Sequence, residues 1–241
     1  MEDLRFKVAL ITGGTKGIGY AVAESLLKQG VNVAITGRTE EGAKDAARQL
    51  NENENDLARA IGLASDVRSF KSQEEVVRAV VEEFGQLDIV IANAGIGHFA
   101  SIEDLSVEKW QETIDTNLTG AFFSLKASVD QLIKNKGYYI SISSLAGTNF
   151  FAGGAAYNAS KFGLTGFSQA VMLDLRKHGV KVSTIMPGSV STYFNGNQPK
   201  ESDAWKIQGE DIGELVVDLL KMNERTLPSK IEVRPTMPPT H

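Results

Sequence analysis

Short apolar runs alternate with longer amphipathic stretches along the chain. The runs are rich in Val, Ile and Ala and predict seven β-strands, at 8–12, 31–36, 58–63, 87–92, 139–143, 181–186 and 230–234. The longer stretches carry apolar residues at helical spacing and predict helices at 18–30, 40–53, 69–84, 106–135, 156–178 and 209–222. Because strands that alternate with helices pair in parallel through right-handed crossovers, the pattern indicates an α/β fold.

The strands are apolar at nearly every position, as expected for a sheet that is covered by helices on both faces. We therefore expect one Rossmann-like doubly wound domain over residues 1–241, with about seven parallel strands. In such a sheet, ligands bind beyond the carboxyl ends of the strands. The residues that follow each strand are therefore the first candidates for a functional site.

A glycine-rich loop, Thr12-Gly-Gly-Thr-Lys-Gly-Ile-Gly19, follows the first strand and leads into a helix. Glycines let the backbone approach a pyrophosphate, and the helix N-terminus offers free N–H groups to it. The spacing of Gly13, Gly17 and Gly19 differs from the G-x-G-x-x-G fingerprint, because the first interval is longer, which indicates a different class of dinucleotide site. The candidate cofactor-binding residues here are Gly13, Thr15, Lys16, Gly17, Ile18 and Gly19.

The end of the second strand bears on which nicotinamide cofactor is used. An acidic residue about 20 positions after the glycines would bind the ribose 2′-hydroxyl of NAD. Here Gly37 takes that place and Arg38 follows, and an arginine can hold a 2′-phosphate through charge-assisted bonds. Lys16 favours the same interpretation, whereas the nearby Glu40 and a merely solvated Arg38 would argue against it. The sequence therefore predicts NADPH.

Polar and small residues also follow the third and fourth strands. Asp66-Val67 and Asn93-Ala94-Gly95 lie in loops that reach the same edge of the predicted sheet. They are suited to contact the adenine and ribose of a dinucleotide.

Tyr157 and Lys161 lie one turn apart in a predicted helix and share a face. A phenol has a pKa of about 10, and a nearby ammonium lowers that pKa, so that the pair can donate a proton near neutrality. Ser143 and Ser144 end the fifth strand, where a hydroxyl could polarise a carbonyl. Asn117 is disfavoured in the middle of a helix and is either a functional residue or a packing amide.

Several of these motifs together resemble the short-chain dehydrogenase/reductase family, whose members include ketoacyl reductases and carbonyl reductases. The resemblance covers about residues 6–192 and rests on the glycine loop, Asn93-Ala94-Gly95, Asn117, Ser144, Tyr157-Asn-Ala-Ser-Lys161 and Pro187-Gly188. It implies reduction of a ketone or aldehyde to an alcohol with NADPH.

The resemblance also implies a role for each catalytic residue. Ser144, rather than Ser143, matches the family by its interval to the tyrosine. Tyr157 would give a proton to the carbonyl oxygen, Lys161 would hold the nicotinamide ribose and lower the tyrosine pKa, and Asn117 would anchor a water that relays protons to Lys161. Thr192 resembles the residue that binds the nicotinamide carboxamide, and Tyr157 and Lys161 count as cofactor-binding residues together with Pro187, Gly188 and Val190.

The substrate is expected beside the catalytic strands, and most of the residues there are apolar or aromatic. Its closest contacts are expected at Ser144, Leu145, Phe151 and Tyr193, among the wider set Ile96, His98, Phe99, Phe150 and Phe194. A hydrophobic or ring-bearing carbonyl compound suits such a lining. The family resemblance implies a lid at about 192–208, and its shortness predicts an open or shallow pocket.

Composition removes several other classes of function. The net charge of −5 argues against a nucleic-acid surface, and the absence of cysteine excludes disulfides and thiolate metal sites. The three histidines show no ligand spacing, so no metal is expected. The sequence shows neither a signal peptide nor a membrane span, which predicts a cytoplasmic protein. The family implies a homo-oligomer, a tetramer or a dimer, built on the helices at 106–135 and 156–178.

Three further functions are compatible with these motifs. The first is that of a 3-oxoacyl-[acyl-carrier-protein] reductase, although the carrier-binding arginines of those enzymes align here with Asn135 and Leu173. The second is that of an NAD-dependent alcohol dehydrogenase. The third is that of a non-catalytic NADPH-binding sensor, which the complete set of catalytic residues disfavours.

Overall fold

The computed structural model describes residues 3–52 and 58–238 and contains one parallel sheet of seven strands. The strand order is β3-β2-β1-β4-β5-β6-β7, which confirms the predicted doubly wound α/β fold. The strands are β1 (Val8–Ile11), β2 (Asn32–Gly37), β3 (Ala60–Ala64), β4 (Ile89–Ala92), β5 (Tyr138–Ile142), β6 (Lys181–Pro187) and β7 (Lys230–Val233). The sequence placed every strand within a few residues of these bounds.

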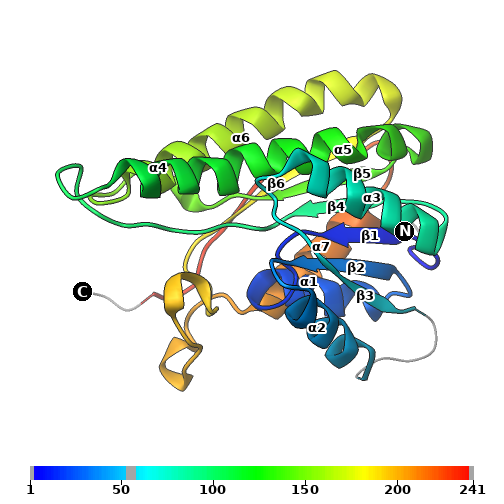
Figure 1. The fold of residues 1–241 in the computed structure, drawn as a ribbon, viewed down its shortest axis with the longest axis horizontal. Helices are drawn as coiled ribbons and strands as arrows, with labels where there is room; N and C mark the ends of the chain where they lie inside the picture. The colour runs from blue at the N-terminus through cyan, green and yellow to red at the C-terminus, as the bar shows by residue number, and fades with distance from the viewer. Residues whose placement is uncertain (1–2, 53–57, 239–241) are drawn as a thin grey trace.

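Helices cover both faces of the sheet (Figure 1). One face carries α1 (Gly17–Leu27), α2 (Glu40–Glu52) and α7 (Gly209–Lys221), and the other carries α3 (Phe70–Phe84), α5 (Gly120–Asn135) and α6 (Ala155–Leu175). Each layer has its own core. Neighbouring residues of β1 show why the strands are apolar throughout, because Ile11 faces the first core, Leu10 faces the second, and both are fully buried.

The helix predicted at 106–135 is interrupted, which the sequence did not reveal. It consists of α4 (Val107–Ile114), a π-helical turn (Asp115–Thr119) and α5. Two tertiary contacts accompany the wider turn: the Asn117 side chain bonds to the loop after β4, and Val67 packs on Gly120 so closely that a Cβ there would lie 2.9 Å from Val67 Cγ2. A π-turn inside an α-helix often marks a functional site.

Smaller differences concern helix ends. The helix predicted at 156–178 stops at Leu175 and continues as a 3₁₀ turn (Arg176–His178), which Gly179 ends in a left-handed conformation with φ of 76°. The helix predicted at 40–53 is α2, and Asn53 lies outside the described residues.

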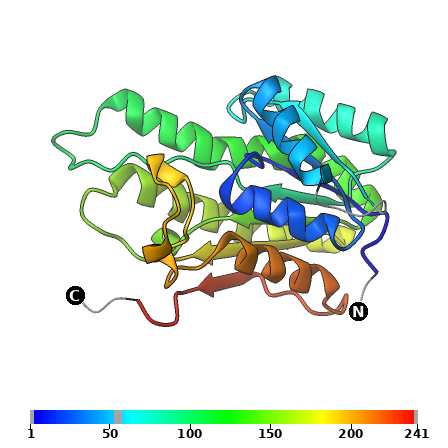
Figure 2. The same cartoon turned by 90° about the horizontal axis from the view of Figure 1, so that it is seen from below.

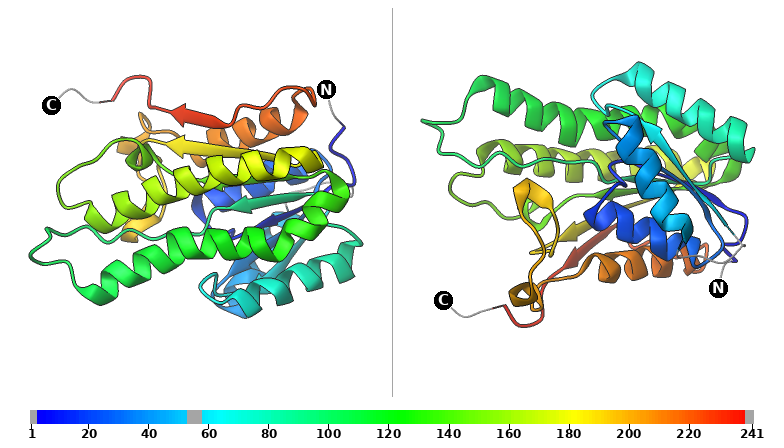
Figure 3. Two further views of the ribbon diagram at one scale, coloured as in Figure 1. Left: turned by 90° about the horizontal axis from the view of Figure 1, so that it is seen from above. Right: turned by 60° about the horizontal axis from the view of Figure 1, so that its bottom comes forward.

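Three segments gather at the end of the molecule where the strands finish (Figures 2 and 3). They are the loop from β4 to α4, the loop from β5 to α6, and the segment after β6. The third segment leaves and rejoins the fold at a parallel bridge between Val190 and Ile207, where Ser191 N donates to Ile207 O at 2.8 Å. It contains two 3₁₀ turns, Phe194–Gly196 and Glu201–Asp203, where the sequence showed no clear helix pattern.

Within residues 3–52 and 58–238, no helix is both long enough and apolar enough to cross a membrane.

Candidate active site

The glycine-rich loop joins β1 to α1 and is shaped for close backbone approach. Gly13 and Gly17 have φ of 65° and 60°, a region that side chains disfavour. Lys16, the residue before α1, provides no side-chain cap for the helix. Helix N-termini leave backbone N–H groups without partners in the helix, and the binding of a phosphate at the start of α1 stays a prediction.

Asn93 and Ala94 hold this loop in place. The Asn93 side chain donates to Thr12 O at 2.9 Å and to Gly13 O at 3.0 Å, and Thr12 Oγ1 accepts from the N–H groups of Asn93 and Ala94 at 3.1 Å. A Cβ on Gly19 would lie 2.5 Å from Asn93 Nδ2. In this structure Asn93 thus supports the glycine loop, and Thr12, which sequence reasoning did not single out, is its main partner.

The adenosine end of the predicted site is marked by charge. Arg38 and Lys16 are both exposed, and the positive charges of Arg68 and Arg38 help to hold the pKa of the Asp66 carboxyl below its usual range. The main cause of this lower pKa is Arg68, whose guanidinium pairs with both carboxylate oxygens at 3.0 and 2.7 Å. Sequence reasoning missed Arg68, although an arginine two residues after an aspartate was a visible signal.

Gly37 occupies the position where an NAD-binding carboxylate would stand. A Cβ at this residue would lie 2.6 Å from Thr15 Cγ2 in the glycine loop. The loop and the end of β2 are therefore packed too closely for any side chain at position 37 without movement of Thr15. Packing, and not only charge, opposes an acidic residue here.

Lys161 and Asn117 come together beside Gly95, and the Tyr157 ring lies near Lys161. A Cβ on Gly95 would lie 3.3 Å from Asn117 Oδ1 and 3.7 Å from Lys161 Nζ. Lys161 is 4% exposed, and its Nζ donates to Ile142 O at 2.9 Å and lies 5.7 Å from the centre of the Tyr157 ring. The side chains expected to act together thus share one region at the end of β5.

Burial sets the direction of both pKa shifts in the pair of Tyr157 and Lys161. Burial raises the pKa of Tyr157, and the Ser144 hydroxyl beside it counteracts this only in part. Burial also lowers the pKa of Lys161 to about 8. The role of Lys161 in lowering the tyrosine pKa stays a prediction, because burial is the main cause of the shift in this structure. The phenol is protonated at neutral pH.

The two serines have different surroundings. Ser143 is buried, and its hydroxyl bonds to Lys161 O at 3.2 Å and to the Thr165 hydroxyl at 3.0 Å. Ser144 is less buried and lies beside the phenol of Tyr157. The geometry thus favours Ser144 as the residue that faces a substrate, and Ser143 as a support of α6.

Asn117 is 1% exposed and its side chain is heavily engaged. Its Oδ1 accepts from Ile96 N at 2.8 Å, while its Nδ2 donates to Ile96 O at 2.9 Å and to Ser160 Oγ at 3.0 Å. Asn117 is therefore a packing amide with all its polar atoms bonded. These bonds tie the loop after β4 to α6, the helix that carries Tyr157 and Lys161. The role of water anchor stays a prediction.

The residues expected around the substrate separate into groups. The rings of Phe99 and Phe194 lie against the Tyr157 ring, and Phe151 lies against Phe99. The Tyr193 ring instead lies near the glycine loop, 6.0 Å from Lys16 Nζ. Phe150 is 85% exposed. Leu145 packs toward Gly188, where a Cβ would lie 3.1 Å from Leu145 Cδ1. Thr192 lies beside Gly17, where a Cβ would lie 3.5 Å from Thr192 Cβ.

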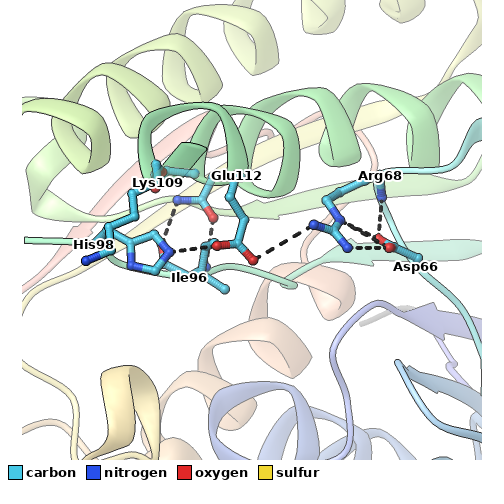
Figure 4. Close-up of polar contacts among 8 residues, drawn as sticks. Asp66, Arg68, Ile96, His98, Lys109 and Glu112 are labelled. Atoms are coloured by element: carbon cyan, nitrogen blue, oxygen red, sulfur yellow. Dashed lines mark hydrogen bonds and ion pairs between the residues drawn. The ribbon is translucent and has the colours of Figure 1, made fainter. Parts of the chain in front are cut away.

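A row of four ionisable side chains runs along the rim of the site (Figure 4). His98 Nε2 and Glu112 Oε2 lie 2.9 Å apart, and Glu112 Oε1 lies 3.8 Å from Arg68, which pairs with Asp66. Glu112 belongs to α4 and was not singled out in the sequence, because its partners are distant along the chain. The row connects the predicted adenine side to the loop after β4.

Comparison with known proteins identifies the class. The family model for short chain dehydrogenases matches residues 7–203, so the chain belongs to the short-chain dehydrogenase/reductase family of oxidoreductases, whose fold binds a nicotinamide cofactor. Among the described residues, no group of three or more His, Asp or Glu side chains is placed to hold a metal ion.

Three similar proteins illustrate the range of the family. The chain is 38% identical to trans-4-hydroxycyclohexanecarboxylate dehydrogenase of Sinomonas cyclohexanicum over 77% of its own length and 73% of that protein. It is 30% identical to an alcohol dehydrogenase from the archaeon Thermococcus sibiricus, solved with 5-hydroxy-NADP, with a TM-score of 0.90 and coverage of 98% and 99%. A 3-ketoacyl-(acyl-carrier-protein) reductase from Brucella melitensis, solved with NADH, is 24% identical with a TM-score of 0.86 and coverage of 97% and 98%, which shows the fold alone.

Proposed function

We propose that this protein reduces a ketone or aldehyde to an alcohol with NADPH, and that Tyr157 is the proton donor. The observation that carries the proposal is the arrangement at the end of β5. A protonated phenol lies beside Ser144 and one helical turn from the buried Lys161. Reduction requires an acid that can protonate the carbonyl oxygen, and the phenol of Tyr157 can serve as that acid where a nearby ammonium stabilises the phenolate that it leaves.

The residues present fit a dinucleotide phosphate. The uncapped start of α1 would hold the pyrophosphate, and Arg38 and Lys16 would hold the 2′-phosphate. Lys161 would hold the nicotinamide ribose, and Thr192, Pro187, Gly188 and Val190 would line the nicotinamide end. The reduced nicotinamide supplies the hydride when it is bound.

The remaining chemistry belongs to side chains of this protein. The Ser144 hydroxyl donates to the carbonyl oxygen and orients it toward the phenol. Tyr157 then transfers its proton to that oxygen as the carbonyl carbon is reduced, and the C=O bond becomes an alcohol. The Lys161 ammonium stabilises the phenolate that is left behind. Because the steps are reversible, the same residues would oxidise an alcohol with the oxidised cofactor.

Replacing Tyr157 with Phe tests the proposal. Turnover of every ketone in a panel is expected to fall by at least about 100-fold, because a general acid contributes that much or more. NADPH affinity, measured by calorimetry, should stay close to that of the unmodified protein. Turnover that survives in Tyr157→Phe would exclude the mechanism, and NADPH binding without turnover in the unmodified protein would favour a non-catalytic sensor.

The same assays distinguish carbonyl reduction from two related activities. Faster reduction of β-ketoacyl thioesters than of free ketones would indicate an acyl-carrier-protein reductase. Tighter binding of NADH than of NADPH would indicate an NAD-dependent alcohol dehydrogenase.

A further inference from the structure

Aromatic rings surround the side chain of Tyr157. The Phe99 ring lies 5.4 Å from the tyrosine ring in an edge-to-face arrangement, and the Phe194 ring lies 5.8 Å from it. Phe151 extends the group, with its ring 5.8 Å from Phe99. These phenylalanines come from three separate segments: the loop after β4, the loop before α6 and the segment after β6. We call Phe99, Phe151 and Phe194 the aromatic wall.

The close packing of the wall depends on Gly97. A Cβ at this position would lie 2.8 Å from the Phe194 ring and 2.9 Å from the Phe99 ring. The absence of a side chain therefore lets both rings pack against the backbone of Gly97 as well as against the tyrosine. The loop that carries Gly97 is fixed at Ile96 by the two bonds to Asn117. The wall is thus a built part of the site and not a chance meeting of loops.

Part of the apolar surface of the wall is exposed. Phe99, which contacts Tyr157, is 45% exposed, and Phe151, which contacts Phe99, is 48% exposed. Covering aromatic surface of this kind is favourable, and aromatic rings gain further from edge-to-face contacts. A ligand with a flat or chair-shaped apolar ring would satisfy these surfaces, whereas a charged or strongly polar arm would be desolvated there without a partner.

We propose that the substrate is a ketone whose carbonyl belongs to, or directly adjoins, an apolar ring, and that the aromatic wall selects that ring. This inference rests on the proposed function, because it places the carbonyl at Tyr157 and Ser144. The ring packs against the exposed surface of Phe99 and Phe151 while its carbonyl oxygen faces the phenol. A ring also loses less conformational freedom on binding than an open chain of the same size. The wall therefore favours a ring both through apolar contact and through this smaller entropic cost.

A matched pair of ketones tests the proposal. Cyclohexanone and 2-hexanone have equal carbon numbers, and both are assayed with NADPH. The KM for cyclohexanone is expected to be lower by about tenfold, because the open chain must immobilise several bonds. Calorimetric titration of the two ketones into the protein loaded with NADP⁺ measures the same preference without turnover.

Two substitutions localise the effect. Phe99→Leu is expected to reduce the preference for cyclohexanone by about threefold or more, because it removes a ring contact worth roughly that factor. Phe150→Leu is the control, since that phenylalanine lies one residue from the wall and is 85% exposed. Gly97→Ala should act like Phe99→Leu by forcing the rings apart. Equal loss in Phe99→Leu and Phe150→Leu would contradict a role for the wall.

Failure of this inference differs from failure of the proposed function. If 2-hexanone or a β-ketoacyl thioester has the lower KM while Tyr157→Phe still abolishes turnover, the ring preference is wrong and the reductase mechanism stands. If no ketone is reduced and the titrations show no ketone binding, the proposed function itself is wrong.

Discussion

The Nζ atom of Lys161 lies 5.7 Å from the centre of the Tyr157 ring and donates to the carbonyl of Ile142 at 2.9 Å. A lysine that is 4% exposed is costly to keep charged, and its pKa is lowered to about 8. The structure therefore holds this side chain near the tyrosine at the expense of stability. The stability of the protein should therefore depend on pH through Lys161.

Lys161→Met is expected to stabilise the protein at pH 7. Below about pH 8 the lysine is charged in both the folded and the unfolded state, so the full burial cost, about 3 kcal/mol, is present. Above the unfolded pKa of 10.5 it is neutral in both states and the cost vanishes, so the stability of the unmodified protein rises between these values. After allowing for the lost bond to Ile142, the variant should gain about 1–2 kcal/mol at pH 7.

Urea unfolding at pH 7 and at pH 9.5 measures the difference. The advantage of Lys161→Met should shrink at the higher pH. A variant that is less stable than the unmodified protein by the same amount at both pH values would contradict the burial of a charged lysine.

The neighbouring serines are expected to respond in opposite ways to substitution. Ser144→Ala should lower kcat by about 100-fold, because it removes a donor aimed at the carbonyl oxygen, and should lower the melting temperature only slightly through the lost bond from Ala146 N. Ser143→Ala should lower the free energy of unfolding by about 1 kcal/mol, because it breaks buried bonds to Lys161 O and Thr165. Steady-state kinetics and thermal melts of both variants check this, and a reversed pattern would exchange their roles.

The sequence was sufficient for the fold because its signals are local. Alternating strands and helices, the glycine loop and the Tyr157…Lys161 spacing each depend on residues that are close along the chain. The helical layers on both faces follow from such signals by the general rules of parallel connections, whereas the strand order comes from the structure alone.

The features that the sequence missed depend on contacts between distant segments. The π-turn at Asp115–Thr119 is associated with bonds from Asn117 to Ile96, and the pattern of residues around it along the chain does not predict it. The pKa of Tyr157 is set by burial, which cannot be read from its spacing to Lys161. Of the expected lining residues, only the structure could separate Phe194, which contacts Tyr157, from the exposed Phe150.

The contacts of Glu112 predict a positioning role for this residue. Its carboxylate joins His98, in the loop that carries Phe99, to Arg68, which holds Asp66. Glu112→Ala should raise the KM for a ketone by about two- to fivefold with a smaller effect on kcat, as expected for partly exposed ion pairs. The control is Glu108→Ala on the same helix, where the carboxylate bonds within its own turn. Equal effects of the two substitutions would contradict the role.

Exposed phenylalanines on α5 and α6 predict self-association. Phe122 and Phe162 are 44% and 43% exposed, while Leu164 on α6 is buried in the core. We expect a homotetramer or a homodimer in sedimentation velocity, and Phe162→Asp should shift it to a smaller species, because an interface cannot bury an unpaired charge. Phe150→Asp, on an exposed loop, should leave the mass unchanged. A monomeric unmodified protein at micromolar concentration would refute the prediction.

Cofactor choice is expected to depend on Gly37 and Thr15 as well as on Arg38. Arg38→Asp should weaken NADPH binding by about 10- to 100-fold, because it removes a charge-assisted contact and adds repulsion. Gly37→Asp alone should bind NADH poorly, since its Cβ would lie 2.6 Å from Thr15 Cγ2. Adding Thr15→Gly should relieve that contact and let the new carboxylate reach the ribose. Calorimetric titration with both cofactors tests each variant, and tight NADH binding by Gly37→Asp alone would show that Thr15 moves aside without cost.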